Sequence, residues 1–543
     1  MMQDIAGLRE RLVARSPLLR PDNRAYPWLV MAAVGFGSIM SILDTTVVNV
    51  AIAKLEVSFG ASTDAVQWVI TGYLLSFAVM LAAAGWLSDR FGYKTIFLTA
   101  VALFTFGSFL CSLSWSLSSL ILFRIIQGIG GGMMGPVGGA YIRRVFPKEK
   151  LGLAMGIYII PALVVSSFGP TIGGWIIDNL SWQLIFSINV PIGFVGLGVA
   201  YLILREYREE VSARFDYAGF ASIALALGAL LLALSDGNAE WNADGWHSTF
   251  ILGCFAVSAV GFLFFFVTEL TTDHPLIDFS IFKNYNYSLG SFVLFVFGLG
   301  IFGSDFLLPL YLQIGLGYTP MQAGVVFIPY GLGMLVTSIV GGRLTDRIGG
   351  KVPGLIGILL RGYGMYRFVF LSPYSSYNEI LVTVLLLAAG MGLLASPIQT
   401  TIFMAVPVKK AAQGSGLIQV IRQLGGSFGV AILSTILAQR EKFHLLTDGQ
   451  AISSSSPLFK QVLSQAALRA MSATGGTASA ASSKAESMIM SALQTHSFVQ
   501  AINDTFFITM IISIVSSIPF LFLKTKPGRA RTGANASAKP ALE

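Results

Sequence analysis

Residues 85–94 read GWLSDRFGYK, and residues 342–351 read GRLTDRIGGK. The identical positions pair Gly85 with Gly342, Leu87 with Leu344, Asp89 with Asp346, Arg90 with Arg347, Gly92 with Gly349 and Lys94 with Lys351. A basic turn alone would account for the arginines and lysines, but not for glycine and aspartate at the same spacing. We therefore interpret the two segments as an internal repeat that marks two related halves of the chain.

The composition excludes a soluble protein. The chain has 543 residues, of which 54% are hydrophobic and only 11% are charged, and its mean hydropathy is +0.73. Soluble domains carry about a quarter charged residues. The two cysteines, Cys111 and Cys254, lie inside apolar runs, which argues against a disulfide framework. A polytopic membrane protein remains.

The apolar runs predict fourteen membrane-spanning helices, since each is long enough to cross a bilayer as a helix and too continuous for a barrel strand. The expected spans are 27–50, 66–87, 95–115, 118–141, 152–176, 182–204, 216–235, 248–269, 287–312, 321–343, 352–371, 378–402, 412–438 and 500–523. Helices satisfy their own backbone hydrogen bonds in lipid, so the expected fold class is an all-α membrane protein.

The distribution of basic residues predicts the orientation. If the N-terminus is cytoplasmic and the fourteen spans alternate, most of the 35 lysines and arginines fall on the inner side, and the short outer loops hold only Lys54. Both termini are then cytoplasmic. This placement also accounts for the net charge of +8 without nucleic acid binding.

The repeat predicts the domain organisation. Its copies follow spans 2 and 10, which are eight spans apart, whereas two directly joined six-span halves would separate them by six. We therefore expect two extra helices between two six-helix halves. The expected boundaries are a cytoplasmic arm at 1–26, an N-terminal half at 27–204, an insertion at 205–269, a C-terminal half at 270–523 and a cytoplasmic tail at 524–543.

The repeated residues suggest a role in conformational change. Gly85 and Asp89 share one helix face, where the glycine allows a second helix to approach and the aspartate is placed to cap a helix N-terminus or pair with an arginine. Such a contact would form in one state of two rocking halves and break in the other. The gating residues predicted on this basis are Gly85, Asp89, Arg90, Gly92, Asp346 and Arg347.

Further motifs resemble a known family. They are LDTTVVNVAI (43–52), LILFRIIQGIGGG (120–132), FGPTIGG (168–174), SWQLIFSINVPIG (181–193) and IRQLGGSFGVAI (421–432). Together with the repeat they resemble the major facilitator superfamily, and within it the fourteen-spanner drug:proton antiporter branch (EmrB/QacA-like). The resemblance implies the major facilitator fold and a secondary transporter rather than an enzyme. It also implies multidrug efflux with antibiotic resistance, driven by the proton gradient without a cofactor, in a bacterial inner or cytoplasmic membrane.

Asp44 and Arg124 lie within apolar helices, where burying a charged side chain costs the most free energy. Asp44 must be protonated or paired, which suits a proton carrier; the alternative is a structural acid bonded to Thr45, Thr46 or Asn49. Arg124 cannot lose its proton, so its buried charge needs hydrogen-bonding partners. It therefore either takes part in proton coupling or connects neighbouring helices structurally. Gln127 lies one turn further on and is placed to share those contacts.

The second half has its own intramembrane charges. Asp305, in GSDFLLPLYLQ, is expected to be a second proton site or a countercharge for a cationic substrate. Arg361 and Arg422 are equally consistent with structural pairing and with attraction of an anion, whereas Arg367 is placed to reach the membrane surface.

Small residues and prolines mark span 5, where they allow bending and close packing, and the family resemblance links this helix to export. The antiporter-helix residues are Pro161, Gly169, Pro170, Gly173 and Gly174. Aromatic and polar positions suggest a cavity for lipophilic ligands, although most such side chains simply face lipid or other helices. The expected cavity residues are Asn49, Trp68, Tyr73, Gln127, Phe306, Tyr311, Gln313 and Arg361.

The Ser- and Ala-rich outer loop at 439–499, with an amphipathic segment near 457–470, suggests a solvated linker, a cap or a docking surface for a periplasmic adaptor. The glycine-rich stretch at 128–136 lies inside an apolar helix, so it is not a nucleotide loop. The scattered histidines lack the spacing of metal ligands.

The sequence thus predicts a proton-coupled exporter of lipophilic or cationic compounds that works by alternating access. Its partners would be the small-molecule substrate, protons and membrane lipids, together with a periplasmic adaptor and an outer-membrane channel if the route is tripartite. The alternative is a specialised exporter of a single metabolite, lipid, peptide or siderophore. A membrane enzyme or sensor would need a catalytic cluster or a soluble domain, and the sequence suggests neither.

Overall fold

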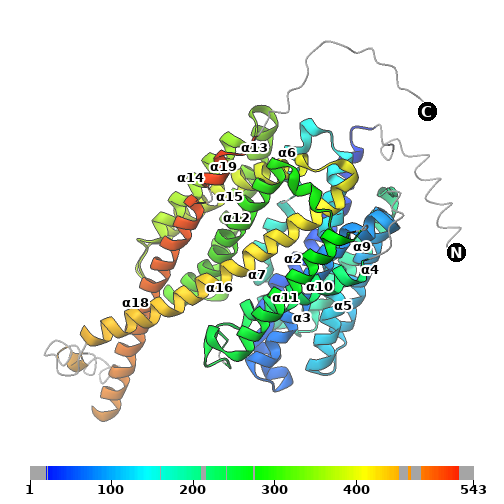
Figure 1. Ribbon diagram of the computed structural model, residues 1–543. Coiled ribbons are helices and arrows are strands. Elements are labelled where there is room, and N and C mark those ends of the chain that lie inside the picture. The colour runs from blue at the N-terminus through cyan, green and yellow to red at the C-terminus, as the bar shows by residue number, and fades with distance from the viewer. Residues whose placement is uncertain are drawn as a thin grey trace, which may run out of the picture.

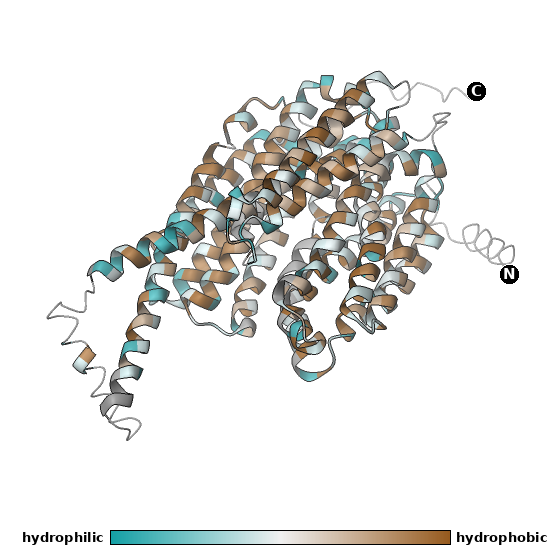
Figure 2. Ribbon diagram, turned by 60° about the horizontal axis from the view of Figure 1, so that its bottom comes forward, coloured by the Kyte–Doolittle hydropathy of each residue, from teal (hydrophilic) through white to brown (hydrophobic). Residues whose placement is uncertain are grey.

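The computed structural model describes residues 20, 23–158, 160–208, 216–239, 241–272, 275–451, 461, 463–465, 478–515 and 517–524. Within these ranges the chain is a bundle of helices joined by short turns, without a strand (Figure 1). Apolar side chains dominate the body of the bundle, and polar ones gather at its ends (Figure 2). This hydropathy pattern is that of a bundle embedded in lipid.

The N-terminal half follows the predicted spans closely. Its helices are α2 (Tyr26–Phe59), α3 (Thr63–Phe91), α4 (Tyr93–Ser112), α5 (Leu117–Val145), α6 (Leu151–Tyr158), α7 (Ile160–Asn179), α8 (Leu184–Ser187) and α9 (Asn189–Ile203). Local signals set the helix ends: Ser62 and Ser116 cap the starts of α3 and α5, and Gly60 ends α2 at a φ of 60°.

The insertion and the C-terminal half follow in the expected order. The insertion consists of α10 (Tyr217–Asp236) and α11 (Thr249–Thr271), and the C-terminal half contains α12 (Tyr285–Leu310), a π-helical turn (Tyr311–Gly315), α13 (Pro320–Ile348), α14 (Lys351–Phe368), α15 (Tyr377–Ala405), α16 (Ala411–Ala451), α18 (Ala478–Val515) and α19 (Ser517–Leu521). Helices α10 and α11 pack on each other, and α10 also contacts both α3 and α16. The insertion therefore lies against both halves.

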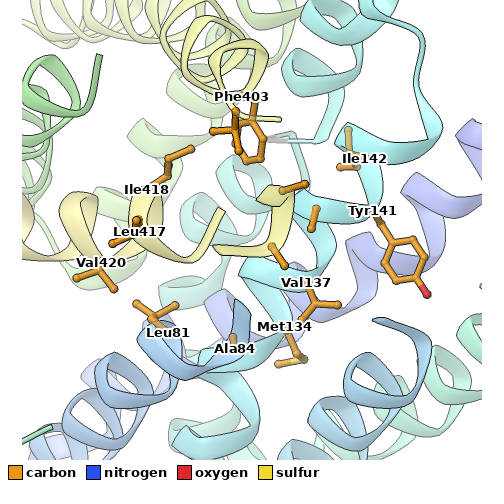
Figure 3. Packing of buried hydrophobic residues seen from close by; sticks show 14 of the residues in the cluster. Leu81, Ala84, Met134, Val137, Tyr141, Ile142, Phe403, Leu417, Ile418 and Val420 are labelled. Atoms are coloured by element: carbon orange, nitrogen blue, oxygen red, sulfur yellow. The ribbon is translucent and has the colours of Figure 1, made fainter. Parts of the chain in front are cut away.

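The two halves meet in a continuous apolar core. Figure 3 shows Leu417 of α16 next to Leu81 of α3, and Ala84 of α3, Val137 of α5 and Phe403 of α15 belong to the same cluster of buried side chains. All five are buried. This core lies near the end of the bundle where both copies of the repeat are found, which we call the motif end. The charge distribution predicts that this end is cytoplasmic.

Eleven helices in the described part of the chain are long and apolar enough to cross a membrane. The three expected spans not among them are 152–176, 287–312 and 352–371. The first is described as two helices on either side of residue 159, the second as shorter apolar stretches, and the third, α14, carries three basic residues within 18 positions. The chain is a multi-pass membrane protein; the count of fourteen spans and the sides of the termini remain predictions.

The outer segment 439–499 differs from the expected solvated linker. Helix α16 continues to Ala451 and α18 begins at Ala478, so helices enter the segment from both ends and project from the bundle (Figure 1). At 1.5 Å per residue, the 41 residues of α16 are about 62 Å long, roughly twice the hydrocarbon thickness. Most of the amphipathic segment predicted near 457–470 lies outside the described residues.

Ion pairs join the projecting helices where they leave the bundle. Arg440 Nε lies 2.6 Å from Asp504 Oδ2, and His444 Nε2 lies 2.7 Å from the same oxygen. One turn further out, the hydroxyl of Ser497 donates to Asp448. We call residues 439–451 and 478–499 the helical extension. Composition alone underestimated it, because alanine and alternating charge favour a helix once a partner helix is present.

Candidate functional site

The first candidate site is a polar network within the N-terminal half. Asp44 lies in the middle of α2 and is fully buried, and Arg124 of α5 is 1% exposed. Arg124 Nη1 donates to Asp44 Oδ2 at 2.5 Å, and Arg124 Nε donates to the carbonyl of Val69 at 3.0 Å. The two charges therefore neutralise each other across three helices.

Gln127 completes the network. Its Nε2 donates to Asp44 Oδ1 at 2.7 Å and to the hydroxyl of Ser108 at 2.7 Å, while its Oε1 accepts from Arg124 at 2.8 Å. Asn189, at the start of α9, donates to Asp44 Oδ1 at 3.3 Å. Both carboxylate oxygens of Asp44 thus have donors.

Two aromatic rings flank the arginine. The guanidinium carbon of Arg124 lies 4.2 Å from the ring centre of Tyr73 and 5.6 Å from that of Phe186. The faces of such rings attract cations, especially where water is excluded. The phenol oxygen of Tyr73 lies 3.2 Å from the hydroxyl oxygen of Ser41, and this contact connects the Tyr73 ring to α2.

The network stabilises one negative charge on Asp44 and one positive charge on Arg124 in apolar surroundings. Any change in the charge of either side chain would break the ion pair between them. A proton added to Asp44 would remove the countercharge of Arg124, and an unpaired buried charge is expensive. Protonation of Asp44 would therefore be coupled to rearrangement of α2, α4, α5 and α9. The alternative partners Thr45 and Thr46 donate to backbone carbonyls of α2 rather than to Asp44.

Helix α7 packs tightly beside this network. A Cβ at Gly169 would lie 2.0 Å from Thr46 Oγ1, and one at Gly173 would lie 2.9 Å from Val47 Cγ1. These glycines let α7 approach α2 directly next to Asp44. Pro161 and Gly174 are half-buried on the same helix, and the side chain of Pro170 lies outside the described residues.

The second candidate site is the contact between the halves at the motif end. Asp346, at the end of α13, accepts hydrogen bonds from the backbone nitrogens of Gly152 at 2.9 Å and Leu153 at 3.0 Å, both in the first turn of α6. An acidic residue at a helix N-terminus satisfies free N–H groups and complements the helix dipole. Asp346 therefore caps a helix of the opposite half, which is one of the two contacts that the sequence suggested for Asp89, its equivalent in the first copy of the repeat.

The first copy of the repeat faces the other half in the same way. A Cβ at Gly85 would lie 2.8 Å from the Cα of Gln413, at the start of α16. The carboxylate of Asp89 is buried and accepts from the hydroxyl of Tyr93 at 3.0 Å. Each copy of the repeat thus places its glycine against the first turn of a helix in the opposite half, since Gly342 likewise lies against Gly152.

The second glycine of each copy ends a helix. Gly92 and Gly349 are the C-caps of α3 and α13, with φ values of 100° and 85°. Side chains rarely adopt positive φ, so glycine is required at both positions. Arg90 is half-buried and Arg347 is exposed.

Arg143 adds a contact that sequence reasoning missed. Its Nε donates to the carbonyl of Phe403 at 2.8 Å and its Nη2 to that of Val406 at 3.3 Å, at the end of α15. Unpaired carbonyls at a helix C-terminus attract cations. The sequence indicates only that Arg143 is one of the basic residues of the predicted inner side. Sequence reasoning also missed Ser108 and Asn189, although Asn189 lies in the motif SWQLIFSINVPIG (181–193).

The remaining predicted residues are not gathered into one cavity by the described contacts. Tyr73 and Gln127 belong to the Asp44 network, Tyr311 donates to the carbonyl of Ser372, and Arg361 is 2% exposed and donates to the carbonyl of Gly300. Trp68, Gln313 and Arg422 are exposed, and Phe306 is half-buried. The side chains of Asn49 and Asp305 lie outside the described residues.

The fold and these two sites define a class: a multi-pass helical transporter with two related halves that contact through a repeated motif. Residues 34–430 match the Major Facilitator Superfamily. The chain belongs to this family. Its members are secondary transporters, so the protein is a transporter of small molecules rather than an enzyme.

Relatives and solved structures agree with this assignment. The chain is 30% identical over 93% of its length to "Uncharacterized MFS-type transporter YhcA" of Bacillus subtilis, covering 94% of that protein. It is 36% identical to "Multidrug resistance protein B homolog" of Mycobacterium tuberculosis, with 74% of each chain covered. It is 33% identical to "Putative multidrug resistance protein MdtD" of Salmonella paratyphi A, with 79% of this chain and 90% of that one covered.

The fold resembles that of solved transporters. The proton:xylose symporter XylE superposes with a TM-score of 0.59 at 14% identity, covering 93% of this chain and 98% of the other. The human organic anion transporter MFSD10 superposes with a TM-score of 0.57 at 12% identity, covering 90% and 99%. At such low identity the likeness concerns the fold alone.

Proposed function

We propose that the protein is a proton-coupled exporter that moves lipophilic or cationic drug-like compounds out across a bacterial inner or cytoplasmic membrane. The observation that carries the proposal is the buried Asp44–Arg124–Gln127 network, which can accept a proton only by giving up an ion pair. The multidrug-resistance names of two relatives support the substrate class. The proton gradient, rather than a bound cofactor, supplies the energy.

The proposed cycle uses the two sites in turn. With the motif end held closed by Asp346 on α6 and Arg143 on α15, a proton from outside reaches Asp44 and releases Arg124. The amide of Asn189 turns so that its oxygen, which has no donor among the described residues, accepts the new hydroxyl. The resulting shift of α2 against α5 loosens the motif end, and the proton leaves on the cytoplasmic side as substrate rebinds.

The test is transport by purified protein in liposomes with an imposed pH gradient. Asp44→Asn should abolish gradient-driven efflux of a lipophilic cationic dye, while Asp244→Asn, at an exposed loop position, should transport normally. Transport by Asp44→Asn at the wild-type rate would refute the proton-carrier role. If Asp44→Asn folds poorly because Arg124 is left unpaired, Asp44→Asn/Arg124→Gln removes both charges and is expected to fold without coupling.

A panel of chemically unrelated dyes and drugs separates the two kinds of exporter. Efflux of several unrelated compounds supports the multidrug proposal, whereas efflux of a single class supports the specialised exporter of a metabolite, lipid, peptide or siderophore. The helical extension is the surface we propose for a periplasmic adaptor that leads to an outer-membrane channel. Cross-linking through cysteines placed on the extension in whole cells tests that assignment.

A further inference from the structure

Two carboxylates meet where the insertion begins and ends. Asp216 precedes α10 and accepts from the backbone nitrogen of Gly219 through Oδ1 at 2.8 Å. Glu269 lies in the last turn of α11, is 4% exposed, and accepts from the backbone nitrogen of Ile277 through Oε2 at 3.1 Å. One oxygen of each carboxylate is thus satisfied by the backbone.

The other two oxygens converge without a donor. Asp216 Oδ2 and Glu269 Oε1 are both buried, and neither has a hydrogen-bond partner among the described residues. A Cβ at Gly219 would lie 2.4 Å from the first and 2.7 Å from the second, so the oxygens approach each other across this glycine. Two bare carboxylate oxygens repel each other in a buried site, and burial without a partner is costly.

The surrounding charged groups leave the pair uncompensated. The turn before α12 carries Asp278 and Lys283; Asp278 is bonded to Lys410, which lies just before α16. In the described part of the chain, neither of these lysines forms an ion pair with Asp216 or Glu269. The neighbouring Leu276 and Ile277 are buried and apolar. The positive group that the pair requires is therefore not a side chain of the described chain.

We propose that Asp216 and Glu269 bind one proton between them, as a hydrogen bond from a carboxyl group to a carboxylate. The pair then carries one negative charge, which the N-terminus of α10 and the two backbone N–H donors stabilise. A hard metal ion fits less well, because such ions need about six or more oxygen ligands and only two oxygens are free here. Gly219 is required because any side chain would separate the two oxygens.

The site is placed to link the insertion to the rest of the bundle. It joins the start of α10 to the end of α11, and the chain from Glu269 leads through Asp278 directly into α12. Loss of the shared proton would leave two adjacent negative charges and loosen this junction. The proposal does not depend on proton coupling through Asp44, since its test requires no transport.

The test uses the full-length protein in lipid nanodiscs and compares wild type with Glu269→Gln. Infrared difference spectra recorded while pH is raised from about 6 to about 9 should show, in wild type, loss of a protonated-carboxyl band that is missing from the spectra of Glu269→Gln. Signals from other carboxyl groups, such as Asp44, should be the same in both proteins. The melting temperature of wild type should fall over the same range, because the stabilising proton is lost as pH rises. In Glu269→Gln it should stay flat, because the amide supplies the hydrogen permanently.

Glu206 provides a matched control. Its carboxylate accepts from the backbone nitrogens of Lys94 and Thr95 and from the Thr95 hydroxyl, so both of its oxygens have donors. Glu206→Gln should keep the infrared band and the pH dependence of wild type. If Glu269→Gln folds poorly, Asp216→Asn can take its place and should give the result expected of Glu269→Gln.

Two results would overturn the proposal. One is a carboxyl band and a pH-dependent melting temperature that persist in both Glu269→Gln and Asp216→Asn. The other is a rise in the wild-type melting temperature on adding sodium, potassium or magnesium chloride that Glu269→Gln abolishes, which would assign the site to a metal cation.

Discussion

At the residue scale, burial of a charged pair determines the chemistry available to the N-terminal half. Asp44 and Arg124 are each almost completely buried and are held by Gln127, Ser108 and Asn189. The sequence identified the first three of these residues, because charges and amides stand out in apolar helices. It could not identify Ser108 or Asn189, since small polar residues are common in membrane helices and only their contacts distinguish them.

Gln127→Leu tests the network without removing a charge. Leucine keeps much of the volume but leaves the Ser108 hydroxyl without its donor and Arg124 without one of its acceptors, and Asp44 Oδ1 keeps only the donor of Asn189. We therefore expect a loss of about 1–3 kcal/mol in stability. Thermal unfolding in detergent should show a lower melting temperature. Gln313→Leu, at an exposed position, should change it little. An unchanged Gln127→Leu would mean that the network contributes no stability.

At the element scale, the described contacts between the two halves at the motif end are made mainly by helix ends. Asp346 caps α6, Arg143 binds the end of α15, and Gly85 lies against the start of α16, so the two halves touch where helices of one begin or end against the other. The repeat singled out Gly85 and Asp346 as gating residues, and helix capping was one of the two contacts suggested for its aspartates. Which helix each copy would meet depended on the packing of distant spans, which sequence spacing does not contain.

Gly85→Ala should open this contact. The added Cβ would clash with the backbone of Gln413, which cannot yield as a flexible side chain would, so α3 must move away from α16. A cysteine at buried Ala412, in a background lacking Cys111 and Cys254, should react faster with a thiol reagent added from the motif end. Gly228→Ala, whose Cβ would meet nothing within 4 Å, is the control and should not change that rate. Equal rates in the two variants would contradict the close packing.

Hydrogen exchange tests the helical extension. Continuous helices at 439–448 and 483–499 should slow amide exchange well beyond that of an unstructured chain, with protection decreasing away from the bundle. Asp504→Ala should reduce protection only slightly, because the pair with Arg440 is partly exposed and such pairs contribute about 0–1 kcal/mol. Immediate exchange throughout both segments would contradict continuous helices and would support the solvated linker suggested by the composition.

At the scale of the whole molecule, the insertion lies across the seam between the halves. At one end the side chain of Asn238 donates to Ser434 and Thr435 of α16; at the motif end Asp278 pairs with Lys410 just before the same helix. The insertion is therefore attached to α16 at one end, and the connection that follows it, at the start of the predicted C-terminal half, is attached just before the same helix at the motif end. The eight-span offset of the repeat predicted two extra helices at this position, but it did not predict their attachment to α16.

The motif-end attachment should weaken in acid. Burial alone would raise the pKa of Asp278, but hydrogen bonds from Lys410 and Ser280 outweigh it and lower the pKa overall. A lowered pKa means that the pair stabilises the fold above the ordinary aspartate pKa of about 4 and that this contribution is lost as pH falls through the lowered value. Wild type should therefore lose its advantage over Asp278→Asn on acidification.

Melting temperatures of wild type and Asp278→Asn between about pH 3 and 7 measure the effect. The difference should be small, below about 1 kcal/mol, because both partners are about one-third exposed to solvent. Asp244→Asn, at an exposed loop position, should show no such convergence with wild type. A constant difference between wild type and Asp278→Asn at all pH values would contradict the assignment.

Hydropathy, spacing and repetition are local or periodic properties of the chain. They were sufficient to predict the membrane class, the order of the helices and the residues that carry buried charge, and to suggest two related halves. The packing of distant helices set the partners: Asp44 with Arg124, Asp346 with α6, and Glu269 with Asp216. It also decided that much of the outer segment is helical. These outcomes depend on which helices lie side by side, and side chains far apart in the chain acquire a partner only when packing excludes water and brings them together.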